Sequence, residues 1–460
     1  MKQLFFMIVI TGAATFGSVF HPIWAVLLYY FFAILRPQYL WEWALPHGIR
    51  WSLLAAVILF FSLLANANRM VGRFKANVIT VLLVVFALLV GASMVFAMDP
   101  NVSGQWAAIY AKVLLVTLMA AIVIDRMSYL RWLVLVAMLS IGYIAYTVNY
   151  LYLVNGRLDI YHVGYGGLDN NGAALLLAMG LPLTYCFIVS RAKGHGLWLR
   201  GLSVLLAAFL IHAVMMSYSR GAMLAAIVGV GWLMWRHRFR YQSVLALVLL
   251  AVMISVMAGP QIRDRFASTR EYQRDSSAQR RVASWEAAWA MAWDRPILGY
   301  GIRNSSQYIK QFSDNRVAPT VHNQYLQVAA DSGIPAVLTY VALVLFSLWR
   351  LRRSELRCRD AARQRAESHD ATSDRLWDAS SLMLGLQGSL LTFMVGGMFL
   401  SLELLELPWL IIAIAAAAPA VVDRLLDQDT HRIDEEEDVA DDQEQHQASS
   451  RPARWRKRAA

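Results

Sequence analysis

The stretch LRGLSVLLAAFLIHAVMMSYSRGAMLAAIVGVGWLMW (199–235) contains two long apolar runs with Arg220 between them. The runs cover residues 199–216 and 222–235, and Arg220 stands in the short polar segment YSRGAM (218–223). A guanidinium cannot lose its proton, so burying it in hydrocarbon is costly. The pattern therefore predicts two membrane-crossing helices, with Arg220 at the turn between them and near the headgroup level.

Similar apolar runs recur along the chain of 460 residues, which is 58% hydrophobic, 16% charged and has a mean hydropathy of +0.46. Runs of about 20 apolar residues predict helices that cross a bilayer. The first three runs are short, so we expect an all-α polytopic membrane protein with 12–13 transmembrane helices. The runs cover residues 4–20, 22–35, 52–65, 77–97, 105–124, 131–154, 172–190, 199–217, 221–235, 241–259, 334–349, 379–401 and 408–422.

Basic loops between these runs predict the orientation, because Lys and Arg in short loops favour the cytoplasmic side. They lie at residues 68–75, 125–131, 191–200, 236–240 and 350–365, and alternating spans place all five on one side. The opposite side then receives residues 36–51, 98–104, 155–171, 217–220, 260–333 and 402–407. Thirteen full spans would put the N-terminus outside and twelve would put it inside. Since the basic residues lie mostly in these loops, the net charge of +11 indicates topology and anionic lipids, not nucleic acid.

The domain organisation follows from the one long soluble insert. The sequence predicts N-terminal transmembrane helices at 1–259, a large outer loop domain at 260–333, C-terminal transmembrane helices at 334–422 and a disordered cytoplasmic tail at 423–460. Within the loop, SAQRRVASWEAAWAMAW (277–293) has the apolar spacing of an amphipathic helix, which RPILGYG (295–301) ends. A second short helix is expected from near His322 towards Gly333.

Two cations lie in or beside predicted spans. Arg220 is either an interfacial arginine whose side chain extends to the headgroups or a residue that binds an anion. The second role is chemically suitable because the planar guanidinium group can donate to two phosphate oxygens at once. Lys112 lies within the 105–124 run, roughly 10 Å below the outer surface at the rise of a helix. It either extends to the interface or contacts a lipid phosphate.

The outer loop adds further cations. Arg280 and Arg281 precede Trp285, and Arg281 shares a helix face with that tryptophan four residues on. Each of these arginines could equally belong to a solvated basic face, but together they form an outer surface that suits an anionic ligand. The remaining loop arginines are Arg263, Arg265, Arg270, Arg274, Arg303 and Arg316.

His322 begins the segment HNQYLQVAADSG (322–333), just before the chain re-enters the membrane. A histidine here can act as a base or donate to a phosphate, whereas the alternative for His322 and Asn323 is the polarity of a helix cap. Asp169 in GLDNNGA (167–173) also suits a helix cap. Glu403 and Glu406 flank the last outer turn and could pair with the arginines. No metal-binding motif is present, so the sequence predicts neither a metal nor another cofactor.

Four segments in this order resemble the bacterial O-antigen ligase family, which includes O-antigen polymerases and protein O-oligosaccharyltransferases. They are LDNNGAALLLAMGLPL (168–183), SYSRGAMLA (217–225), RVASWEAAWAMAWDRPILGYG (281–301) and HNQYLQVAADSGI (322–334). The stretch RPQYLWEW (36–43) is similar to a subgroup of O-glycosylation ligases associated with exosortase systems. Asp331 stands where the family often has Glu, which is a mild departure.

The resemblance implies a glycosyltransferase-C-like helical fold in the bacterial inner membrane, with the large loop in the periplasm. It implies a glycosyltransferase that moves a glycan from undecaprenyl diphosphate to an acceptor hydroxyl on lipid, protein or polysaccharide, without metal. The family's catalytic positions fall on Arg220, Arg281 and His322. Lys112 resembles a basic residue of the family's preceding helix. We expect Lys112, Arg280, Arg303 and Asn323 to be substrate-binding residues.

Two other functions remain open at the level of sequence. A polymerase would use a second lipid-linked repeat unit as the acceptor, and the same cations would serve it. A transporter of lipid-linked sugars would need a polar path across the whole membrane. The spans between residues 131 and 259 carry few charges at mid-membrane depth, which favours chemistry at one surface.

Overall fold

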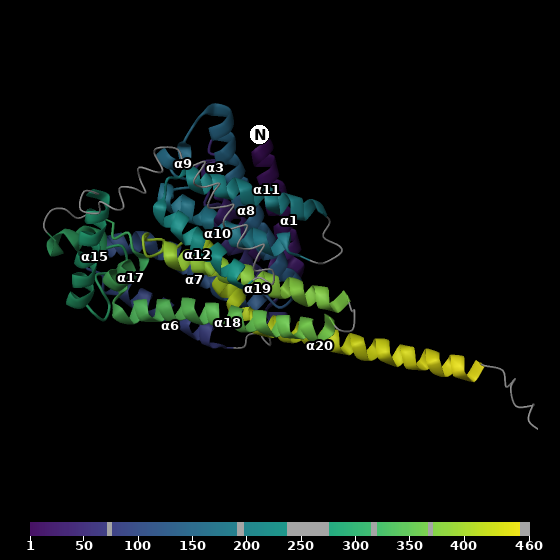
Figure 1. Ribbon diagram of the computed structural model, residues 1–460. Helices are drawn as coiled ribbons and strands as arrows, with labels where there is room; N and C mark the ends of the chain where they lie inside the picture. The colour runs from purple at the N-terminus through teal and green to yellow at the C-terminus, as the bar shows by residue number, and fades with distance from the viewer. Residues whose placement is uncertain (71–75, 191–196, 237–275, 314–319, 367–370, 451–460) are drawn as a thin grey trace, which may run out of the picture.

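The computed structural model describes residues 1–70, 76–190, 197–236, 276–313, 320–366 and 371–450. Nine helices in these ranges are long and apolar enough to cross a membrane, which confirms an all-α polytopic membrane protein (Figure 1). They are α1 (Lys2–Phe20), α6 (Val78–Val95), α7 (Pro100–Val123), α8 (Met127–Asn155), α10 (Asn170–Ile188), α11 (Leu197–Met216), α18 (Ile334–Ala366), α19 (Ala371–Gly396) and α20 (Glu406–Ser450).

Three further predicted segments form shorter helices: α2 (Ile23–Leu35), α4 (Trp51–Ala65) and α12 (Arg220–Arg236). The remaining predicted segment, 241–259, lies outside the described residues. One-turn helices follow α2, α4 and α8, and these are α3 (Pro37–Leu40), α5 (Ala67–Met70) and α9 (Asp159–His162).

Helix α19 forms the centre of the bundle and packs against α10, α12 and α18. Glycines allow the closest approaches. A Cβ on Gly385 of α19 would lie 2.2 Å from the Sγ of Cys186 in α10. A Cβ on Gly229 of α12 would lie 2.0 Å from the Oγ1 of Thr392 in α19. Small residues at such crossings let helix backbones pack closely where lipid supplies no hydrophobic driving force between helices.

Contacts between helix ends join the six predicted outer segments into one face, which we call the motif face. Its described parts are residues 36–41, 98–104, 155–171, 217–220, 297–313, 320–333 and 397–406. The joining contacts are Arg36 Nη1 to the Gly166 carbonyl (2.6 Å), Asp99 N to Asn304 Oδ1 (2.7 Å), Ser219 Oγ to Asn171 Oδ1 (2.7 Å), Gln324 N to the Gly397 carbonyl (2.9 Å) and Arg36 to Glu406 (3.2 Å).

The predicted basic loops gather at the other end of the helices, which we call the basic face (residues 125–131, 190, 236, 352–359, 378 and 423–424). Arg131 pairs with Asp378 (3.8 Å), and Arg424 pairs with Asp125 (3.6 Å). The buried carboxylate of Glu355 contacts three guanidinium groups, those of Arg236, Arg352 and Arg359. The described part of the chain therefore separates the two sets of loops as the sequence predicts.

The N-terminus lies on the motif face. Phe6 contacts Trp41 there, with 6.1 Å between ring centroids, while His21 at the end of α1 contacts Tyr129 on the basic face at 5.1 Å. Helix α20 leaves the bundle on the basic face beside Asp125. The described ends of the chain therefore lie on opposite faces, and the number of spans, twelve or thirteen, stays a prediction because the segment 241–259 lies outside the described residues.

The long loop contains the two predicted helices, α15 (Ser276–Asp294) and α17 (Gln324–Ser332), which lie together at one end of the bundle (Figure 1). Between them are α16 (Ser305–Tyr308) and the 3-10 helix η2 (Ile309–Phe312). The turn after α15 packs on the end of α17, where Tyr300 N donates to the Ala330 carbonyl at 2.9 Å. Gly299 has a φ of +64°, and a Cβ there would lie 2.5 Å from the carbonyl oxygen of Asp331. Glycine is thus required for this packing.

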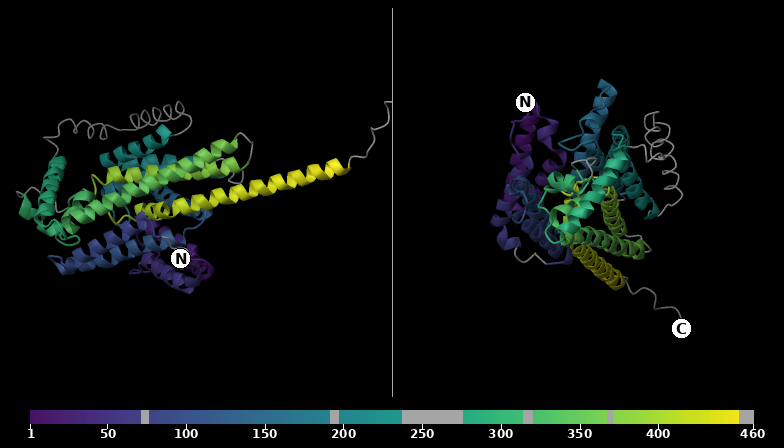
Figure 2. Two further views of the ribbon diagram at one scale, coloured as in Figure 1. Left: turned by 90° about the horizontal axis from the view of Figure 1, so that it is seen from below. Right: turned by 90° about the vertical axis from the view of Figure 1, so that its left-hand side faces the viewer.

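Helix α20 continues to Ser450 and projects past the end of the bundle opposite α15 and α17 (Figures 1 and 2). The sequence predicts a disordered tail from residue 423, so the structure differs from the prediction over the first part of this segment. Alanine, glutamate and glutamine favour helix even when no partner packs against them. An ion pair between Arg357 and Asp423 (2.5 Å) also fixes the direction of α20 where it leaves the basic face.

The α10–α19 crossing makes a direct prediction about stability. Replacing a helical glycine by alanine ordinarily stabilises a helix by about 1 kcal/mol, whereas overpacking costs about 1–3 kcal/mol. Gly385→Ala should therefore lower the thermal unfolding midpoint in detergent, because its Cβ meets Cys186. Gly231→Ala in α12 is the matched control, since no atom lies within 4 Å of its added Cβ. Equal midpoints for the two variants would contradict the close crossing.

Candidate active site

Arg220 is the first residue of α12 and lies half-buried on the motif face. Two serines shape the turn before it. Ser217 Oγ accepts from the backbone N–H of Ser219 (3.2 Å), and Ser219 Oγ accepts from that of Ala222 (3.4 Å). The N-terminus of a helix presents unpaired N–H groups and the positive end of the helix dipole. Arg220 therefore adds its charge to a position that already favours anions.

The start of α10 packs directly on this turn. Asn171 Oδ1 accepts from Ser219 Oγ at 2.7 Å, and Asn170 Nδ2 donates to the Ser217 carbonyl at 3.3 Å. Asp169 caps α10 by accepting from Gly172 N at 2.8 Å, as predicted. The LDNNG and SYSRG segments, about fifty residues apart in sequence, thus form one polar surface.

Phe399, in the turn between α19 and α20, connects this surface to the loop helices. A Cβ on Gly221 would lie 3.3 Å from Phe399 Cβ, and the Phe399 ring lies 6.4 Å from the Trp285 ring between centroids. Trp285 is one helical turn from Arg281 on α15. Gln324, at the start of α17, donates its N–H to the carbonyl of Gly397 in the same turn at 2.9 Å.

His322 immediately precedes α17 and has a φ of 53°. This left-handed conformation is uncommon outside glycine and often marks a functional position. The half-buried site lowers the pKa of His322 through desolvation, and the charge of Arg281 lowers it further. The carboxylate of Asp169 acts in the opposite direction. Both charged groups are therefore close enough to the imidazole to influence its protonation.

Arg281 and Asp169 thus lie near His322, and Arg220 lies on the same face, in the turn that packs on the start of α10. We call these four residues the candidate active site. The imidazole is biased towards its neutral form and can accept a proton at neutral pH. The guanidinium of Arg281 near the imidazole, with that of Arg220 on the same face, suits a phosphate-bearing ligand.

Lys112, a predicted substrate-binding residue, instead pairs with a carboxylate. Its Nζ lies 3.5 Å from Glu406 Oε1 and 3.1 Å from Ser52 Oγ, and both charged side chains are about nine-tenths buried. The sequence shows no acid in the helix of Lys112, but the fold supplies Glu406 from α20. The buried ammonium group of Lys112 is therefore neutralised by the carboxylate of Glu406. Its position alone does not support the prediction that Lys112 contacts the donor.

Arg303 is placed in a similar way. Its guanidinium lies 2.9 Å from Glu403 Oε1 and 4.7 Å from the centre of the Trp106 ring. Burial opposes the charged form of Arg303, but Glu403, Tyr110 and Asp331 together outweigh it and raise the pKa of this arginine. Arg303 thus stabilises the buried Glu403 and holds the loop against α7. Its role in binding substrate stays a prediction.

Asn323 caps α17, accepting hydrogen bonds from Tyr325 N (3.0 Å) and Leu326 N (3.2 Å). The alternative interpretation from the sequence, a helix cap, therefore accounts for its side-chain oxygen. Arg280 is exposed, and its carbonyl accepts from Ser284 Oγ at 2.8 Å. The other predicted loop arginines lie outside the described residues, at positions 263, 265, 270, 274 and 316.

Asp331, the departure from the family pattern, lies on the buried side of α17. Its carboxylate accepts from Ser305 N (3.0 Å) and from Gln327 Nε2 (2.7 Å), while burial raises its pKa. These bonds tie α17 to α16. The shorter acid is accommodated within the loop, away from the candidate active site.

Sequence reasoning missed Arg36, which has a φ of 51° and joins three segments of the motif face. It donates to the Gly166 carbonyl at 2.6 Å and pairs with Glu406 at 3.2 Å. The available signal was a single arginine between an apolar run and Pro37. Within the described residues, no three His, Cys, Asp or Glu side chains gather in a way that could hold a metal ion.

Removing each of the two charges that act on His322 should shift its pKa in opposite directions. Arg281→Gln should raise the pKa of His322, and Asp169→Asn, which keeps a capping side chain, should lower it further. The pH dependence of diethyl pyrocarbonate modification, mapped to His322 by mass spectrometry, measures both. Arg280→Gln is the matched control because Arg280 is the neighbouring arginine on α15 and is exposed. Shifts of the same sign in the two test variants would rule out this arrangement.

Comparisons with known proteins divide the chain into two matched regions. Residues 1–156 match a family of unknown function (DUF5935), and this region contains Arg36 and Lys112. No curated protein matches the chain. Residues 204–341 match the family described as O-Antigen ligase, and this region contains Arg220, Arg281 and His322. The match supports glycan transfer of the ligase or polymerase kind and agrees with the resemblance in the sequence motifs. Over residues 204–341, the chain is therefore similar to the O-antigen ligase family.

Proposed function

We propose that this protein transfers a glycan from undecaprenyl diphosphate to an acceptor hydroxyl at the periplasmic surface of the bacterial inner membrane. The observation that carries the proposal is the candidate active site, where two arginines, a histidine and an aspartate gather on one face of a membrane bundle. Three of these residues lie within the region that matches the O-antigen ligase family.

Arg220 and Arg281 bind the diphosphate in this proposal. When the bond between the anomeric carbon and the phosphate oxygen breaks, its electron pair stays on the leaving diphosphate. Guanidinium groups fixed at that place stabilise the developing charge, and the N-terminus of α12 adds its dipole. This electrostatic assistance needs no metal ion.

His322 takes the proton of the acceptor hydroxyl as the new bond forms between its oxygen and the anomeric carbon. General-base assistance of this kind contributes about 10²–10⁴-fold. The lowered pKa supports the role, since the neutral imidazole is the form that accepts a proton. Asp169 stabilises the imidazolium that results. Attack from the side opposite the diphosphate inverts the anomeric configuration.

The local backbone supports a positioned histidine. Tyr218 and His322, on two elements that meet at the site, both have left-handed φ angles, 54° and 53°. Such conformations cost about 1–3 kcal/mol each and persist where the surroundings fix them. Lys112 and Arg303 contribute indirectly, because their pairs with Glu406 and Glu403 hold the turn between α19 and α20.

Removal of the catalytic groups gives the main test. Arg220→Ala and His322→Ala should each abolish glycan transfer in an assay with purified protein and a lipid-linked donor, while membrane insertion stays normal. Lys310→Ala, an exposed cation in the same loop, is the control and should retain transfer. Near-normal transfer by either test variant removes the role assigned to that residue. A ladder of products, in place of a single addition, would identify a polymerase.

The proposed orientation can be measured separately with single cysteines. Lys310→Cys on the motif face should react with a membrane-impermeant maleimide in intact spheroplasts. Arg363→Cys beyond the basic face, where the native side chain is 59% exposed, should react only after permeabilisation. The native Cys186 and Cys358 are buried and give a low background. The reverse labelling pattern would place the candidate active site in the cytoplasm.

A further inference from the structure

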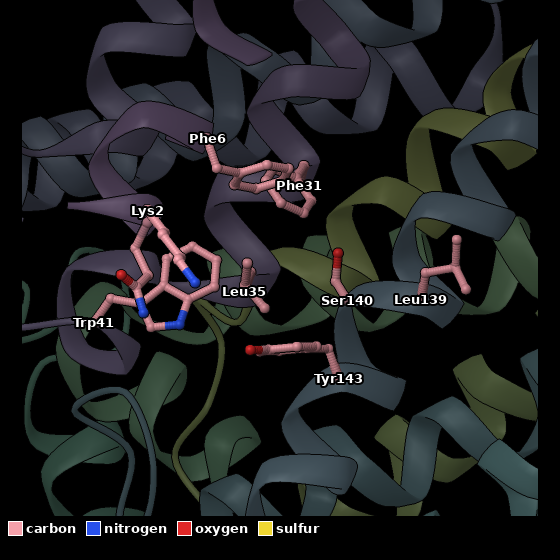
Figure 3. Close-up of a pocket in the computed structure, with 9 residues that line it drawn as sticks. Lys2, Phe6, Phe31, Leu35, Trp41, Leu139, Ser140 and Tyr143 are labelled. Atoms are coloured by element: carbon pink, nitrogen blue, oxygen red, sulfur yellow. The ribbon is translucent and has the colours of Figure 1, made fainter. Parts of the chain in front are cut away.

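An apolar cavity of about 410 Å³ opens between the N-terminal helices and α8 (Figure 3). Phe6 of α1 and Phe31 of α2 form one wall, with Trp41 beside them. Ser140 and Tyr143 of α8 form the opposite wall (Figure 3). Lys2 and Gln3 lie at the start of α1, which is the motif-face end of the cavity.

Several wall residues are accessible from outside the bundle although they are apolar. Phe6 is 45% exposed, and Leu139 and Tyr143 are each about 40% exposed. In a membrane-spanning protein, side chains on this outer surface of the helices face lipid. The cavity is therefore accessible from the bilayer and suits a hydrocarbon chain.

Two polar side chains of the cavity suit the headgroup end of a lipid. Ser140 is 2% exposed, and its Oγ has no hydrogen-bond partner among the described residues. A buried hydroxyl without a partner is unfavourable unless a ligand supplies one. Lys2 forms no ion pair with any carboxylate that the structure describes, so its ammonium group is available to an anion.

We propose that this cavity binds one anionic phospholipid, with an acyl chain among Phe6, Phe31 and Leu139 and the phosphate at Lys2. The Ser140 hydroxyl donates to an ester oxygen of the same lipid. Charge selects the occupant, because the apolar walls accept any chain whereas the lysine at the opening favours a negative headgroup. The lipid is distinct from a glycan donor, whose diphosphate belongs at Arg220 and Arg281.

The position of the cavity gives the bound lipid a structural consequence. Leu35 lines the cavity, and its carbonyl accepts from Tyr165 Oη at 2.6 Å. The neighbouring Arg36 donates to Gly166, so both residues fix the turn that leads to Asp169. All the lining residues fall within the region that matches the family of unknown function. This site therefore gives that region a role in lipid binding, and the inference does not depend on the proposed function.

Photolabelling of the full chain in lipid nanodiscs tests the proposal. The probes are phosphatidylglycerol, phosphatidylcholine and polyprenyl phosphate, each with a diazirine in its chain, and labelled residues are mapped by mass spectrometry. We expect phosphatidylglycerol to label the segments around Phe31 and Leu139 in preference to phosphatidylcholine. Lys2→Gln should reduce this labelling about fivefold, the effect of one cation near an anionic headgroup.

Matched variants separate specific binding from general contact with lipid. Lys310→Gln removes another exposed lysine of the same face and should leave labelling at the cavity unchanged. Ser140→Phe fills the cavity and should reduce labelling there by every probe. Equal labelling by phosphatidylglycerol and phosphatidylcholine, or no effect of Lys2→Gln, would overturn the proposal. Preferential labelling by polyprenyl phosphate would overturn it as well, by identifying a prenyl chain as the occupant.

Discussion

Buried negative charge in the turn between α19 and α20 is the constraint on which the motif face depends. Glu403 and Glu406 are almost fully buried, and a carboxylate at that depth is stable only when cations match it. Arg303 reaches Glu403 from the long loop, whereas Lys112 and Arg36 reach Glu406 from the N-terminal helices. Two regions with separate family matches are thus joined through a turn that belongs to neither match.

The same turn also holds the candidate active site. Its backbone accepts from α17 at Gly397, and Phe399 packs between Gly221 and Trp285. The residues proposed to carry the chemistry therefore rest on a segment that ion pairs fix some distance away. Loops of this kind carry function best when a rigid scaffold positions them. Here the scaffold is a set of matched charges at the end of an apolar bundle.

Much of the architecture follows from sequence because hydrocarbon leaves the chain few choices. Apolar runs must become helices, and charged loops must collect at their ends. The amphipathic pattern of 277–293 likewise predicts α15 closely. The partners of Lys112 and Arg303 could not be predicted in this way. Each pair joins residues far apart in the chain, 294 positions in the case of Lys112 and Glu406, and helical periodicity carries no information about such neighbours. The same limit explains why Arg36 was missed.

The length of α20 has a consequence for how this protein meets the cell interior. Its 45 residues form a rod roughly 67 Å long, more than twice the ~30 Å thickness of the hydrocarbon layer. If the basic face is cytoplasmic, the rod holds an acidic segment well clear of the bilayer. Anionic lipids of the leaflet would repel a negatively charged segment close to them. A separation of tens of ångströms between this segment and the membrane surface is larger than the Debye length at physiological ionic strength, so the repulsion is screened. In that orientation, the length of the helix keeps the acidic segment away from the charge of the membrane surface.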